Sequence, residues 1–388
     1  MNRQNNQNPP IPVLFLSFLR LGLTAFGGPA MVAYIKKMAV DRHKWIDEAT
    51  FKDGVVLCQS IPGSTAMQTA AYVGLRTRNI LGAFVSYVGF GLPAFILMLV
   101  FSALYTGSHN MPKVVSLFSG LQVIVVAIVA QAAFSFGKGM LKSYHDIFIP
   151  VISGILLWIG ISPFIVILGA ALAGIMFFKK SDTPKAFNQV KKETQIFKQI
   201  SLIVLFLSLS LTALYFFDKN LFNLAALMFK IDLFAFGGGF AALPLMHHEI
   251  VGVRGWMSSK TFMDGIALGQ ITPGPITMST TFVGYLLYGF SGAAVATLAI
   301  FTPSFLMVVL ITPFFDKLKG SPYFLGATRA IYASFVGLLC FVTIKFAYAV
   351  PWNMAKILLV LITLVALFKK VDILYVVLVG ALASLFIF

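Results

Sequence analysis

Residues 15–29 read FLSFLRLGLTAFGGP, and residues 225–239 read AALMFKIDLFAFGGG. Each stretch is an apolar run that carries a basic residue, Arg20 or Lys230, six residues ahead of a Phe-Gly-Gly sequence. Glycine and proline disfavour a continuous helix, because glycine is conformationally permissive and proline removes a backbone donor. The same helix interruption therefore occurs twice, 210 residues apart, and the rest of the chain is organised around it.

The sequence around each interruption repeats in register. The second unit returns rare residue types of the first at offsets of 210 or 211: Trp45, Phe51, Asp53, Gln59, Pro62, Gly63, Gly74, Gly82 and Pro93 become Trp256, Phe262, Asp264, Gln270, Pro273, Gly274, Gly284, Gly292 and Pro303. Such a match indicates an internal duplication, the ground plan of many secondary transporters. We divide the chain into a first transmembrane repeat at 1–178, a basic linker plus connecting helix at 179–217, and a second repeat at 218–388.

Composition excludes a soluble globular protein. Of 388 residues, 59% are hydrophobic and 11% are charged, and mean hydropathy is +0.91, whereas soluble domains are about 25% charged. The predicted solvent is lipid. Apolar segments lie at 13–34, 54–75, 80–105, 113–136, 146–161 and 163–178, then at 201–217, and again at 222–246, 265–288, 292–315, 327–349, 355–368 and 371–388.

The net charge of +16 fits loops of a membrane protein better than a nucleic-acid site. Its largest cluster, between 179 and 198, lies between apolar blocks and has no interleaved aromatic residues. If every segment crosses once with the N-terminus inside, most basic residues fall inside, the basic loop 36–52 falls outside, and the two repeats are inverted. The alternative for the loop 36–52 is that it folds back against the membrane as an amphipathic segment. The short pairs, 146–161 with 163–178 and 355–368 with 371–388, could instead dip into the membrane and return. We predict an all-α polytopic membrane protein with inverted repeats and Gly/Pro-broken helices.

The interruptions are the candidate binding site. Bare backbone groups inside a membrane are tolerated only where they line a cavity or pack within protein. Each apolar helix that resumes after a break would point its N–H groups, and the positive end of its dipole, at the break. Kinks and close-packed glycines explain a single break equally well, but a matched set in both units favours a site for a small dianion.

We expect Arg20 and Lys230 to attract the anion and the breaks with their flanking polar residues to bind it. The predicted substrate-binding residues are Arg20, Phe26, Gly27, Gly28, Pro29, Gln59, Pro62, Gly63, Ser64, Thr65, Lys230, Gly237, Gly238, Gly239, Gln270, Pro273, Gly274, Pro275 and Thr277. We expect no buried carboxylates to match these cations.

Other polar residues suggest weaker hypotheses. Asp53 and Asp264 begin their apolar segments, which favours helix N-caps and leaves proton coupling as the alternative. The sequence His247-His248-Glu249 ends a segment and is predicted to be a solvated interfacial cluster. We find no catalytic set, phosphate-binding loop or metal-ligand spacing. We therefore predict no enzyme, cofactor or metal site.

At these residues the sequence resembles the chromate ion transporter family in its long, two-unit form. The resemblance rests on Phe18-Leu19-Arg20-Leu21-Gly22 before Phe26-Gly27-Gly28-Pro29, on Pro62-Gly63, and on Phe236-Gly237-Gly238-Gly239 with Pro273-Gly274-Pro275. Ser64 departs from the family pattern, which has a second proline there. The resemblance implies an exporter of chromate in the plasma membrane that confers chromate resistance.

Rival functions stay open at this stage. The cargo could be sulfate or another oxyanion, alone or by exchange, and a passive anion channel could use the same breaks. An intramembrane enzyme acting on lipid phosphates is disfavoured, because no nucleophile or acid–base pair repeats in both units. The expected partners are chromate, sulfate as a competitor, the lipid bilayer and a second copy of the chain, with no nucleic acid.

Overall fold

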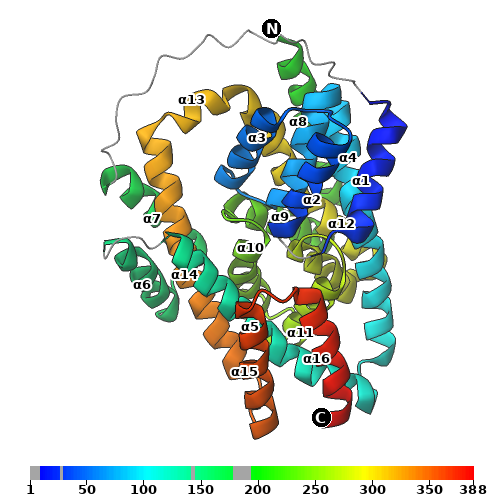
Figure 1. Ribbon diagram of the computed structural model, residues 1–388, viewed down its shortest axis with the longest axis vertical. Helices are drawn as coiled ribbons and strands as arrows, with labels where there is room; N and C mark the ends of the chain where they lie inside the picture. The colour runs from blue at the N-terminus through cyan, green and yellow to red at the C-terminus, as the bar shows by residue number, and fades with distance from the viewer. Residues whose placement is uncertain (1–8, 27–28, 141–144, 178–193) are drawn as a thin grey trace.

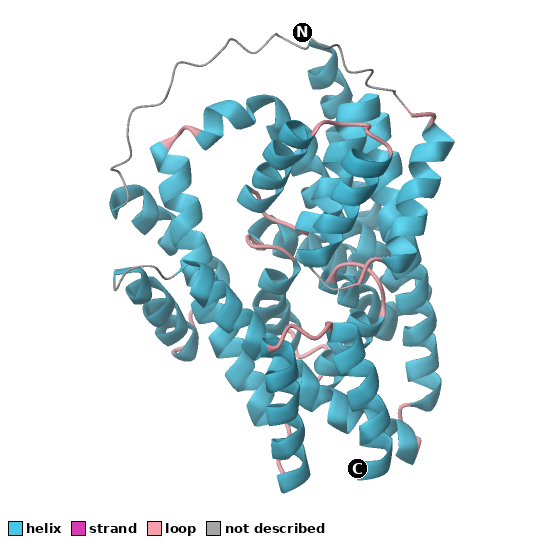
Figure 2. Ribbon diagram, viewed as in Figure 1, coloured by secondary structure: helices cyan, strands magenta, loops and turns pink. Residues whose placement is uncertain are grey.

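The computed structural model describes residues 9–26, 29–140, 145–177 and 194–388. Within these ranges the chain is helical, and its strand-like pairing is an isolated bridge between Pro62 and Phe236 (Figures 1 and 2). The all-α class expected from the sequence is confirmed.

Equivalent helices follow one another in the two repeats. The first contains α1 (Ile11–Thr24), α2 (Pro29–Lys36), the π-helical turn η1 (Lys37–Arg42), α3 (Glu48–Ser60), α4 (Thr65–Ser108), α5 (Pro112–Met140), α6 (His145–Trp158) and α7 (Pro163–Phe177). After α8 (Thr194–Phe217), the second contains α9 (Lys219–Phe234), α10 (Gly239–Met246), the π-helical turn η2 (His247–Val253), α11 (Ser259–Ile271), the 3₁₀ turn η3 (Ile276–Met278), α12 (Ser279–Ile311), η4 (Thr312–Phe314), α13 (Phe315–Lys319), α14 (Pro322–Ala349), α15 (Met354–Phe368) and α16 (Ile373–Ile387). The duplication is thus present in the fold.

α4 and α12 are each two helical arms joined by a tight turn. The turn of α4 lies at Arg78 and Asn79, where φ of Asn79 is +54°. Residues eight apart on a straight helix lie about 12 Å apart, yet a Cβ atom at Gly74 would overlap the carbonyl oxygen of Gly82. The arms 65–77 and 80–108 therefore lie side by side, which agrees with the separate segments expected at 54–75 and 80–105.

The second repeat makes the same fold-back in α12. Tyr288 and Gly289 leave the helical conformation, and the Thr281 and Thr297 hydroxyls are 2.8 Å apart although they lie sixteen residues apart in sequence. The two non-helical pairs are again separated by 210 residues. The hairpin is therefore part of the repeated unit.

Equivalent helices run in opposite directions along the long axis. In Figure 1, α4 ends and α5 begins at the lower end of the molecule, whereas α12 ends at the upper end beside α13. The first described helix, α1, begins at the upper end, and the last, α16, ends at the lower end. The repeats are inverted, as expected.

The segments that the sequence treats as single crossings differ in helix length. Within the described residues, the helices long and apolar enough to cross a membrane are α4, α5, α14 and the stretch 276–314. Helices of 14–16 residues, such as α15 and α16, reach about 21–24 Å, less than the hydrocarbon thickness of about 30 Å. Figure 1 shows α15 rising from the lower end and α16 returning to it. This pair forms a short antiparallel hairpin.

The basic segment 36–52 lies at the end of the molecule where α1 begins, contrary to the expectation that it lies at the opposite end. α3 sits at the upper end in Figure 1. The scheme misplaced this segment because it treated 13–34 as one full crossing, whereas the chain breaks after Ala25 and continues as a second short helix.

The two repeats are interleaved. The short helices α6 and α7 of the first repeat pack on α14 of the second, and α15 and α16 of the second pack on α5 of the first. Small residues permit this close contact: a Cβ atom at Gly174 would overlap Gly326, and one at Gly380 would overlap Ile124. Each repeat therefore buries its neighbour's apolar surface.

Candidate functional site

The four helix breaks meet at one place, and each break of one repeat pairs with a break of the other. The backbone N–H of Gly63 donates to the carbonyl of Ala235 at 2.9 Å, and that of Gly274 donates to the carbonyl of Ala25 at 3.1 Å. These two bonds are equivalent under the repeat. We call this meeting point, formed by residues 25–26, 61–64, 235–238 and 272–275, the break crossing.

Residue type explains why the helices stop here. Gly63, Gly237, Gly238 and Gly274 have φ between 89° and 111°, a region that residues with a Cβ atom rarely adopt. A Cβ atom at Gly63 would also overlap the Ser304 hydroxyl. The glycines therefore determine where the helices break.

Helices that begin at the break crossing lack side-chain caps. The N-cap residues Ser64 of α4, Gly238 of α10 and Pro275 of η3 make no side-chain cap hydrogen bond. In contrast, α3 and α11 begin away from the breaks with caps from Asp47 and Ser258. The first N–H groups at the crossing therefore carry the positive end of each helix dipole without a side-chain cap from the N-cap residue.

Three of these helix starts lie close together. A Cβ atom at Gly238 would lie 3.4 Å from Oγ1 of Thr65, and one at Gly239 would lie 3.8 Å from the backbone nitrogen of Thr277. The starts of α10, α4 and η3 therefore bring residues of both repeats to one point. Such converging amides and hydroxyls suit an oxyanion.

Several polar side chains around this point are buried without a hydrogen-bond partner. These atoms are Nε2 of Gln270, Oγ1 of Thr277, Oγ of Ser279 and the hydroxyl of Tyr332. The Tyr332 ring lies 3.4 Å from a Cβ atom placed at Gly237. Because buried polar groups normally have partners, this set is a candidate lining for a polar ligand.

The structure brings most predicted site residues to the break crossing. Pro62, Gly63, Ser64, Thr65, Gly237, Gly238, Gly239, Gln270, Pro273, Gly274, Pro275 and Thr277 lie in the breaks or at the helix ends beside them. Phe26 is half-buried in the first break, and Pro29 begins α2. Gly27 and Gly28 lie outside the described residues, and Gln59 is exposed on α3.

The two predicted cations are placed differently. Arg20 is exposed on α1. Lys230 forms an ion pair with Glu249 at 3.0 Å and lies 3.8 Å above the centre of the Phe164 ring. Its ammonium group is therefore already paired with a carboxylate, which it shares with Arg254.

Buried carboxylates were not expected, and this expectation is wrong. Glu249 is 6% exposed and also accepts from Arg254 at 2.8 Å, so it is not part of a solvated cluster. Asp232 and Asp264 are buried as well. The N-caps of α3 and α11 are Asp47 and Ser258, not the expected Asp53 and Asp264.

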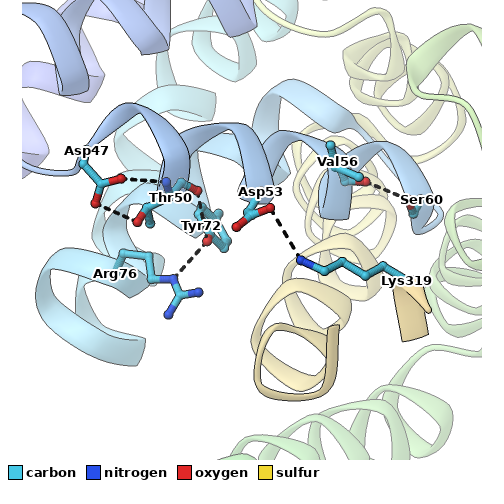
Figure 3. A network of polar contacts seen from close by, with 8 residues as sticks. All are labelled: Asp47, Thr50, Asp53, Val56, Ser60, Tyr72, Arg76 and Lys319. Atoms are coloured by element: carbon cyan, nitrogen blue, oxygen red, sulfur yellow. Dashed lines mark hydrogen bonds and ion pairs between the residues drawn. The ribbon is translucent and has the colours of Figure 1, made fainter. Parts of the chain in front are cut away.

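The equivalent helices α3 and α11 are held differently. Asp264 of α11 accepts from Tyr105 at 2.9 Å and from Gln122 at 2.8 Å, both in the first repeat. Its counterpart Asp53 has a side chain that is 62% exposed and lies 3.6 Å from Lys319 of α13 (Figure 3). α11 packs on α5, α14 and α16, whereas α3 packs mainly on α4. The two repeats thus differ in how α3 and α11 are packed.

Figure 3 also shows how α3 begins. Asp47 accepts from the backbone N–H and the hydroxyl of Thr50, both at 2.8 Å. These bonds favour the charged carboxylate and lower the pKa of Asp47. The helix starts at the break crossing have no such side-chain cap.

A groove between α6 and α14 is chemically unsuited to an oxyanion. Its lining is mainly apolar and includes Pro150, Trp158, Cys340 and Phe341. It offers few hydrogen-bond donors, so the break crossing is the better candidate.

Comparison with known proteins gives two matched regions. The sequence model described as chromate transporter matches residues 13–175 and 222–385. An uncharacterized transporter of Methanocaldococcus jannaschii is 41% identical over 97% of this chain and 94% of its own length. The chromate transport protein of Cupriavidus metallidurans is 29% identical over 92% of this chain and 87% of its own. A probable chromate transport protein of Synechococcus elongatus is 30% identical over 79% and 76%. No solved structure matches the chain.

Proposed function

This chain belongs to the chromate transporter family, and we propose that it exports chromate from the cytoplasm across the plasma membrane and thereby confers chromate resistance. The observation that carries the proposal is the break crossing. There, uncapped helix starts from both repeats meet beside the hydroxyls of Thr65 and Thr277.

The donors at the crossing suit a tetrahedral dianion. The starts of α4, α10 and η3 lie close together, so their first backbone amides are near one another, and hydroxyls can turn to fit. Lys230 is engaged by Glu249, so binding rests on neutral donors and helix dipoles. Such a site can release its cargo, because no fixed opposite charge has to be separated from it.

The membrane potential favours export. A dianion that leaves a cell with a negative interior gains about 4.6 kcal/mol per 100 mV, twice the value for one charge. That energy sustains a concentration ratio above about a thousandfold, because about 1.4 kcal/mol corresponds to a factor of ten. Export therefore needs no coupled ion, whereas import would.

Basic residues indicate which end faces the cytoplasm. Lys44 lies just before α3 and Lys52 lies within it, and α3 is at the upper end of Figure 1. Arg78 lies at that end too, since it donates to the carbonyl of Pro9 at 2.8 Å. By the positive-inside rule this end is cytoplasmic.

Transport into inverted membrane vesicles tests the proposal. We expect labelled chromate to accumulate when the vesicle interior is made positive, with saturation and with competition by sulfate. Vesicles without the protein give the background. Flux without saturation or counter-substrate exchange would indicate a channel, and absence of chromate flux under any gradient would contradict the proposal.

A further inference from the structure

A carboxylate that the repeat does not require lies beside the break crossing. Asp232, near the end of α9, is 1% exposed. Its Oδ2 accepts from the backbone N–H of Ser304 at 2.8 Å and from the Ser304 hydroxyl at 2.6 Å. Its Oδ1 is buried and has no hydrogen-bond partner.

No cation is paired with Asp232 in the described part of the chain. Lys230, two residues earlier, is bound to Glu249. α4 contributes Tyr87, whose hydroxyl donates to the carbonyl of Phe301 at 2.8 Å, and α10 has no titratable side chain. Cys58 of α3 lies near Tyr87. Tyr215 of α8 makes an edge-to-face contact with Phe222, ten residues before Asp232 on α9. Burying an unpaired charge is costly, whereas the two hydrogen bonds from Ser304 favour the charged carboxylate. The charged and neutral forms of Asp232 therefore compete, and a nearby anion favours the neutral one.

One hydroxyl connects Asp232 to the start of α4. Oγ of Ser304, which donates to Asp232, also accepts from the backbone N–H of Ser64 at 3.2 Å. Ser64 is the N-cap residue of α4, and Thr65 follows it at the proposed anion site. A charged Asp232 would therefore place negative charge at the same helix start that an oxyanion would occupy, and the two would repel each other.

The first repeat builds the same crossing without this carboxylate. The positions equivalent to Asp232 and Ser304 are Gly22 and Ala94. A Cβ atom at Gly274 would lie 2.7 Å from Cβ of Ala94, just as one at Gly63 meets Ser304. The break geometry therefore does not depend on a carboxylate, and Asp232 adds something else.

We propose that Asp232 takes up one proton when an oxyanion binds at the break crossing, so that binding is linked to pH. The proton comes from water and adds to the carboxylate, which becomes a neutral carboxyl group. It leaves again when the oxyanion departs. This inference rests on the proposed function, because it assigns a second, proton-binding group to the same site.

Chromate binding to the purified full-length protein tests the link. Binding is measured from about pH 7.5 to 9, a range in which chromate itself is a dianion. For the wild type we expect the dissociation constant to rise with pH, by up to about tenfold per unit, and each bound chromate to bring up to one proton from the buffer. D232N should bind with a dissociation constant that does not change with pH.

Two further variants control for folding and for burial alone. D232G/S304A copies the pair that the first repeat carries, Gly22 and Ala94, and should also bind without a pH slope. D264N removes another buried carboxylate, one whose two oxygens both have partners, and should keep the wild-type slope. A flat wild type, or a slope retained in both Asp232 variants, would overturn the inference. Absence of chromate binding at every pH would instead overturn the proposed function.

Discussion

At the scale of single residues, the hydroxyls of Thr65 and Thr277 are the side chains that distinguish a ligand site from a simple kink. Thr277 is 1% exposed, and its Oγ1 has no partner. A hydrogen bond to a charged group contributes about 1.5–3 kcal/mol. Loss of one such bond should therefore weaken chromate binding at least about tenfold.

We accordingly predict that T65A and T277A each raise the chromate concentration for half-maximal transport by about tenfold or more. Transport into vesicles measures this directly. T302A is the matched control, because Thr302 is half-buried on α12 and its hydroxyl already donates to the carbonyl of Leu298 in its own helix. Equal kinetics for T65A, T277A and T302A would remove both hydroxyls from the site.

Residue types alone predict the breaks but not the charges. A positive φ at Gly63 or Gly274 is encoded by glycine itself, and so the position of each break could be read from the sequence. The ion pair between Lys230 and Glu249 joins residues nineteen apart across a chain reversal. The apolar pattern at 222–246 predicts a single membrane crossing with a break in it. It does not predict that the chain reverses direction there, and so the ion pair could not be predicted.

At the scale of elements, the hairpins of α4 and α12 depend on contact between glycines. We predict that G74V greatly reduces the yield and thermal stability of the folded protein, because the added side chain would overlap the Gly82 backbone of the opposite arm. G107V is the control, since a Cβ atom there meets nothing within 4 Å. Its effect on the free energy of unfolding should stay within about 1 kcal/mol and should not be a loss, because valine is a better helix former than glycine. Equal stability of the two variants would contradict the side-by-side arms.

The unequal exposure of α3 and α11 gives a second prediction at this scale. In a background without Cys58 and Cys340, D53C should react with a water-soluble maleimide about tenfold or more faster than D264C, since reaction rate follows access. Labelling rates in purified protein measure the difference. Comparable rates would show that positions 53 of α3 and 264 of α11 are equally accessible to solvent.

The lengths of short helices were the part of the fold that composition could not determine. An apolar run of fourteen residues has the same hydropathy whether it lies at a membrane face or returns from the middle. What decides its position is the partner it packs on, and for α15 and α16 that partner is α5 of the other repeat. The duplication was visible in the sequence, whereas the interleaving required the structure.

At the scale of the whole molecule, interleaving makes each repeat dependent on the other. We predict that a chain divided between α7 and α8 yields a functional transporter only when both parts are expressed together. Each part alone would expose the apolar surface that its partner covers, such as the face of α5 beneath α15 and α16. Co-purification of the two parts, measured beside each expressed singly, checks this. A stable first part in the absence of the second would contradict it.

The difference between Asp53 and Asp264 implies a second shape for the protein. Gln122, which holds Asp264, has Tyr332 as its counterpart in the other repeat, and that phenol is buried without a partner. If α3 swung inward as α11 has done, Asp53 would approach Tyr332, while release of α11 would free Asp264. If the two inverted repeats exchanged these conformations, the break crossing would become accessible from the opposite side of the membrane.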